Sequence, residues 1–73
     1  MKEKEREIVF DVFSSVHPFL NTPSDLKENI EDLLKKSSNL DEFEGNFEEL
    51  ISNTEDPSMK ADFRIYLNKF RSR

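Results

Sequence analysis

The chain of 73 residues has no cysteine or tryptophan, one glycine and one histidine. Without cysteine, disulfide bridges, thiolate zinc sites and cysteine nucleophiles are all excluded. The single histidine, His17, directly precedes Pro18 and belongs to no recognisable pattern of nucleophile and base, whereas general acid–base catalysis needs an oriented partner. We therefore expect no enzymatic activity, no metal ion and no cofactor.

The chain also lacks a long apolar run. No segment approaches the roughly 20 apolar residues that a membrane-spanning helix needs. The first residues, Met1 to Glu7, alternate in charge instead of following the cationic and then apolar order of a signal peptide. We expect a cytoplasmic protein that does not contact a membrane. The net charge of −5 disfavours a general attraction to nucleic acid but permits one local basic surface.

Apolar residues recur in four segments at the three- and four-residue spacing of amphipathic helices. The expected helices span residues 2–17, 23–37, 40–52 and 57–71. Short connections favour antiparallel neighbours. The sequence therefore predicts an all-α fold, a small four-helix bundle, with residues 1–73 forming one domain.

The first helix is expected to end at Pro18, which removes a backbone donor and disfavours helical geometry in the residue before it. Phe19 and Leu20 follow, and we expect them to continue the apolar stripe into the turn.

Residues that favour helix starts precede the other three helices. Thr22 precedes Pro23, and Asp56 precedes Pro57, so each pair offers a capping side chain followed by proline at the first helical position. Asn39 stands at the end of the break before the third helix. We expect these three side chains to act as N-caps.

The only glycine, Gly45, lies in the middle of the third segment, where it weakens a helix by about 1 kcal/mol relative to alanine. A hairpin turning at Gly45 and Asn46 is the alternative. It would place Glu42 opposite Glu49, and like charges that face each other destabilise a strand pair. We therefore expect a helix here.

The distribution of charge is the main indication of function. Residues 40–56 hold seven carboxylates and no Lys or Arg, whereas residues 60–73 hold five cations and one acid. On a helical wheel, Asp41, Glu44 and Glu48 share one flank of the third helix. We predict a protein-binding module, namely a regulator, adaptor or inhibitor, that presents this acidic flank to a partner with a basic or apolar surface.

Two large apolar residues lie outside the apolar stripes. Phe10 and Ile65 project away from the stripes of the first and fourth helices, and we expect both to be at least partly exposed. If they share a surface, they would add an apolar contact for the partner. Phe43, Phe47 and Leu50 have the spacing of groove-binding anchors, but a chain this short needs them in its own core.

Two other functions remain open. Lys60, Arg64 and Arg71 form a basic stripe on the fourth helix, which could bind phosphates of a nucleic acid. The acidic flank of one copy could also meet the basic stripe of another in a homodimer. A structural alternative is that the third and fourth helices pack side by side and neutralise each other's charge, in exposed pairs that contribute little to stability.

Overall fold

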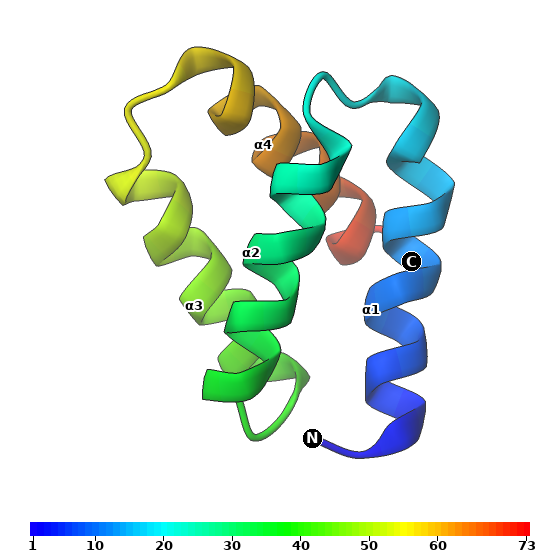
Figure 1. Cartoon of the computed structure of the whole chain (residues 1–73). Coiled ribbons are helices and arrows are strands. Elements are labelled where there is room, and N and C mark those ends of the chain that lie inside the picture. The colour runs from blue at the N-terminus through cyan, green and yellow to red at the C-terminus, as the bar shows by residue number, and fades with distance from the viewer.

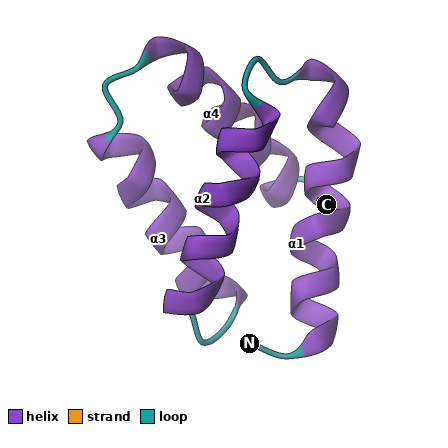
Figure 2. Ribbon diagram, viewed as in Figure 1, coloured by secondary structure: helices purple, strands orange, loops and turns teal.

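The computed structural model describes all 73 residues, which form four helices joined by short loops, without a strand (Figures 1 and 2). The helices are α1 (Glu3–Val16), α2 (Pro23–Lys36), α3 (Leu40–Asn53) and α4 (Pro57–Arg71). The predicted all-α four-helix bundle is confirmed, and each helix begins and ends within one residue of its expected position. None of the four is both long and apolar enough to cross a membrane.

The ends of the helices follow mostly from local chemistry. After α1, Pro18 lies in a short 3₁₀ helix, η1 (His17–Phe19). Asn39 caps α3 by accepting a hydrogen bond from the backbone of Glu42. Asp56 caps α4 through the backbone N–H groups of the second and third helical residues. These caps are confirmed, and α3 runs through Gly45 without the alternative hairpin.

The predicted capping role of Thr22 is wrong. Its hydroxyl makes no capping bond to α2 and instead donates to the carboxylate of Asp62 in α4, at 2.9 Å. The backbone N–H groups of Asn21 and Thr22 donate to the same carboxylate, at 2.9 and 2.6 Å. A carboxylate is the stronger acceptor, so this tertiary contact replaces the local cap. Asp62 is completely buried and fixes the start of α2 against α4.

A second carboxylate joins two other helices. Glu5 in α1 accepts a hydrogen bond from the backbone of Lys2 at the start of its own helix. Its other oxygen accepts from the backbone N–H of Leu40, the first residue of α3, at 3.1 Å. The beginnings of α1 and α3 are therefore held together by one side chain.

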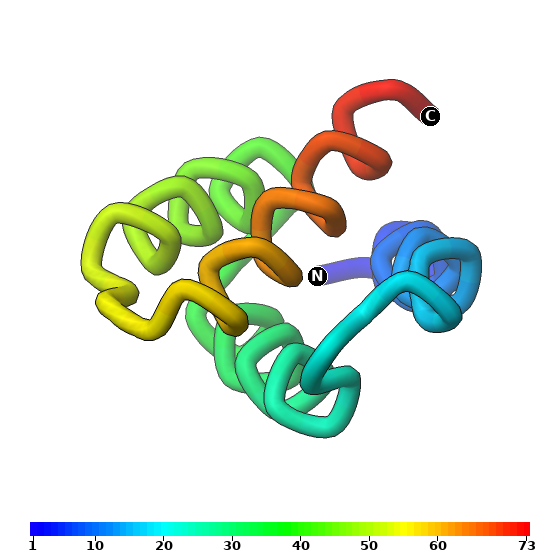
Figure 3. The backbone as a smooth tube through the Cα atoms, turned by 90° about the horizontal axis from the view of Figure 1, so that it is seen from above, coloured from blue at the N-terminus to red at the C-terminus, as the bar shows by residue number.

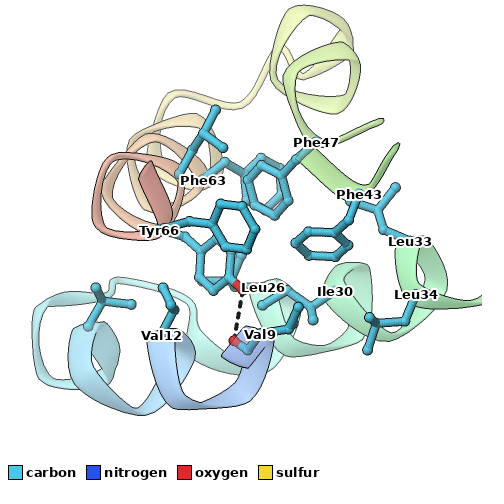
Figure 4. Close-up of a cluster of buried hydrophobic side chains, with 13 residues drawn as sticks. Val9, Val12, Leu26, Ile30, Leu33, Leu34, Phe43, Phe47, Phe63 and Tyr66 are labelled. Atoms are coloured by element: carbon cyan, nitrogen blue, oxygen red, sulfur yellow. Dashed lines mark hydrogen bonds between the residues drawn. The ribbon is translucent and has the colours of Figure 1, made fainter. Parts of the chain in front are cut away.

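The core is centred on α4, which lies between α1 and α3 when the molecule is viewed from above (Figure 3). Its aromatic side chains meet those of α3, and Tyr66 stacks on Phe47 with ring centres 5.0 Å apart. The buried Tyr66 hydroxyl donates to the carbonyl of Val9 in α1, at 2.7 Å (Figure 4). Phe43 and Phe47 are fully buried, and Leu50 packs against the buried core from a partly exposed position. These residues belong to the core, as the length of the chain suggests.

The expectation for Phe19 is wrong, whereas Leu20 does pack against the core. The Phe19 side chain is 71% exposed. A 3₁₀ helix has three residues per turn instead of 3.6, so residues 17–19 leave the register of the α1 stripe. Phe19 is the one large apolar side chain that the fold leaves open to solvent.

Candidate functional site

The outward side of α3 is strongly acidic. This helix has five carboxylates and no Lys or Arg. Four of the acidic residues are exposed and one, Glu44, is partly buried. The acidic residues of α3 are Asp41, Glu42, Glu44, Glu48 and Glu49.

One cation of α4 reaches this acidic side. The Arg71 guanidinium donates through Nε to a carboxylate oxygen of Glu44, at 2.8 Å, and through its terminal nitrogen to Glu48. The hydrogen bond to Glu44 raises the pKa of Arg71 above its ordinary value, and the charges of both glutamates add to this effect. The Arg71, Glu44 and Glu48 side chains remain 45%, 33% and 55% exposed, so solvent weakens both ion pairs. We call these three residues the Arg71 bridge.

The other predicted site residues are not neutralised in this way. Asp41 is exposed and forms no ion pair. In the basic stripe, Lys60 is partly buried and Arg64 is exposed, and neither lies within ion-pairing distance of an acid. The acidic flank and the basic stripe therefore meet at Arg71 alone. The third and fourth helices do pack side by side, as the structural alternative expects, but their charges pair only through the two ion pairs of Arg71.

A shallow surface depression of about 380 Å³ lies beside the Arg71 bridge, between α3 and α4. Ile51 and Leu67 supply its apolar lining, and the remaining lining residues are polar or charged. These are Glu48, Ser52, Arg64, Asn68 and Arg71. No pattern in the sequence marks Ser52, Ile51 or Leu67 as part of a site. The spacing of Arg64, Asn68 and Arg71 on one side of a helix is the signal that marks this edge.

Phe10 and Ile65 lie where the helical wheels place them, at partly exposed positions on α1 and α4. Each packs against the buried core, so much of their apolar surface is already covered by the chain itself. Phe19 is far more exposed than either.

The titratable groups do not assemble a metal site. No three side chains of His, Asp or Glu come together in an arrangement that could hold a metal ion. Burial raises the pKa of the Tyr66 phenol, but this group lies in the core with its hydroxyl bonded to Val9.

The model of the MJ1579 family matches residues 2–73, and the chain therefore belongs to the MJ1579 family. No curated protein and no solved structure matches the chain. A function is therefore inferred from the charged surface of α3 and α4.

Proposed function

We propose that this member of the MJ1579 family is a protein-recognition module of the cytoplasm, which acts as a regulator, adaptor or inhibitor. Its binding surface is the outward side of α3, and its partner presents a basic surface. The observation that carries the proposal is the charge of this helix. Of the five carboxylates of α3, two form ion pairs with Arg71, and no other cation of α4 forms an ion pair. Such an excess of negative charge favours fast association with a positively charged partner.

The position of Gly45 supports the same surface. It is exposed in the middle of α3, its φ angle is negative, and a Cβ atom built there would meet nothing within 4 Å. The fold therefore gains nothing from glycine, although glycine weakens the helix by about 1 kcal/mol relative to alanine. A missing side chain at the centre of an acidic surface lets the backbone of a partner approach closely.

The two other functions are less well supported by the charges of α4. A nucleic acid that bound Lys60, Arg64 and Arg71 would bring its phosphates next to Glu44 and Glu48, which already hold Arg71. For a homodimer, one of the three cations that would meet the acidic flank of a second copy, Arg71, is already bound within its own chain. Both observations favour a separate, basic protein partner.

The proposal is tested by affinity capture from an extract of the native host, treated with nuclease, at near-physiological salt. The wild-type chain is compared with the triple variant Asp41→Asn, Glu44→Gln and Glu48→Gln. We expect the wild type to retain a stoichiometric protein with a basic surface and the triple variant to lose it.

The matched control neutralises three exposed acids of α2, through Glu28→Gln, Glu31→Gln and Asp32→Asn. It removes the same net charge and the same residue types from another side of the bundle. Equal loss of the partner from both triple variants would contradict the proposal, because general charge rather than α3 would then govern binding. Full retention of the partner by the α3 variant would contradict it as well. Loss of all captured protein upon nuclease treatment would instead indicate nucleic-acid binding.

A further inference from the structure

Two glutamates of α3, Glu44 and Glu48, already bind the guanidinium of Arg71. A basic protein partner would present the same chemical group. Arg71 spans Glu44 and Glu48, which lie one helical turn apart, and it directs a different nitrogen to each carboxylate. A guanidinium has five donors in a planar fork and can satisfy two carboxylates at once, whereas the ammonium of lysine is a compact point charge. The Arg71 bridge is thus a guanidinium-binding arrangement formed within one chain.

The Arg71 bridge is also easily opened. Arg71 is the last residue of α4, where helices fray at little cost. Its side chain is 45% exposed, and exposed ion pairs contribute little because solvent screens them and the long side chains lose freedom. No other hydrogen bond of the Arg71 side chain holds it in place.

We propose that Arg71 is an autoinhibitory side chain, which covers Glu44 and Glu48 until an arginine of the basic partner displaces it. This inference rests on the proposed function. It adds that the group recognised on the partner is a guanidinium and that Arg71 competes with this group from within the chain. Loss of the competitor raises affinity, because the partner then meets two free carboxylates. Arginine is preferred to lysine in the partner, because only the guanidinium reproduces both contacts.

The test uses a fluorescently labelled hexa-arginine peptide as the probe, with hexa-lysine for comparison, at low ionic strength. Binding is measured for the wild type, for Arg71→Gln and for the control Lys69→Gln, which removes one positive charge from an exposed residue of the same helix without an ion pair. We expect Arg71→Gln to bind hexa-arginine about three- to tenfold more tightly than Lys69→Gln, in line with the small coupling of exposed pairs. The gain for hexa-lysine is expected to be smaller.

A second measurement needs no peptide. The Nε–H signal of Arg71 in a nitrogen–proton spectrum is expected to be resolved in the wild type and to move when Glu44→Gln and Glu48→Gln are introduced together. If the chemical shift of the Arg71 Nε–H is the same with and without both substitutions, the inference is overturned, regardless of the peptide-binding result.

The outcomes separate this inference from the proposed function. Equal hexa-arginine affinity for Arg71→Gln and Lys69→Gln would overturn the autoinhibitory role and leave the proposed function standing. Failure of both peptides to bind any of the three proteins would contradict the proposed function and the inference with it, whereas binding of hexa-lysine alone would overturn the inference. A selective gain for Arg71→Gln supports both.

Discussion

Replacing Asp62 with alanine is expected to destabilise the fold more than any surface substitution. The carboxylate is completely buried and accepts three hydrogen bonds, from two backbone N–H groups and the Thr22 hydroxyl. A hydrogen bond to a charged group contributes about 1.5–3 kcal/mol, and a buried donor left without a partner costs about 1–3 kcal/mol. Asn21 is exposed and Thr22 is half-buried, so water can reach some of the freed donors. We therefore expect a loss of about 2–4 kcal/mol for Asp62→Ala.

That loss is large for this chain. At about 0.05–0.15 kcal/mol per residue, a domain of this size is stable by only several kcal/mol. The free energy of unfolding is measured by urea denaturation followed by circular dichroism. Thr22→Val removes only the hydroxyl donor and is expected to cost about 1 kcal/mol, whereas Glu28→Ala, an exposed acid on α2, is expected to stay within about 0.5 kcal/mol of the wild type. A cost for Asp62→Ala no greater than that for Glu28→Ala would refute the reasoning.

Three further predictions concern stability. Tyr66→Phe removes the hydrogen bond to Val9 and is expected to lower the free energy of unfolding by about 1 kcal/mol in urea denaturation; a gain in stability would contradict that role. Burial raises the pKa of the Tyr66 phenol above its ordinary value of about 10. The phenol of the unfolded chain therefore ionises first, and the advantage of wild type over Tyr66→Phe should shrink above that pH; an advantage that grows would show the sign to be wrong. Gly45→Ala is expected to stabilise α3 by about 1 kcal/mol in thermal denaturation, because the new methyl group meets open space, and to weaken capture of the partner; a stabilised variant with unchanged capture would argue against close approach at Gly45.

Most of the fold could be predicted because its signals are local. The spacing of apolar residues, together with Pro18, Asn39 and Asp56, placed every helix boundary to within one residue. The capping role predicted for Thr22 was wrong because its local context is that of an N-cap, whereas its hydrogen-bond partner is forty residues away in the sequence. Asp62 gives a partial signal, since it lies four residues before Tyr66 within the apolar stripe of α4. The groups that donate hydrogen bonds to Asp62 could not be predicted without knowing how α4 packs against the loop between α1 and α2.

The candidate site was predicted less completely. The charges of α3 follow from the sequence, but the choice of Arg71 rather than Lys60 or Arg64 as their partner depends on how α4 lies along α3. A helical wheel gives the direction of a side chain and no information about its position along a neighbouring helix. Phe19 was missed for a related reason, because a short 3₁₀ helix shifts the register of the residues that follow α1.

The most direct test of the central claim is to map the bound surface by backbone amide chemical shifts while the captured partner is added. The proposed function predicts shifts concentrated in α3, from Leu40 to Asn53, that weaken as salt is raised. Shifts confined to α1 and η1 around Phe19, with α3 unchanged, would contradict it.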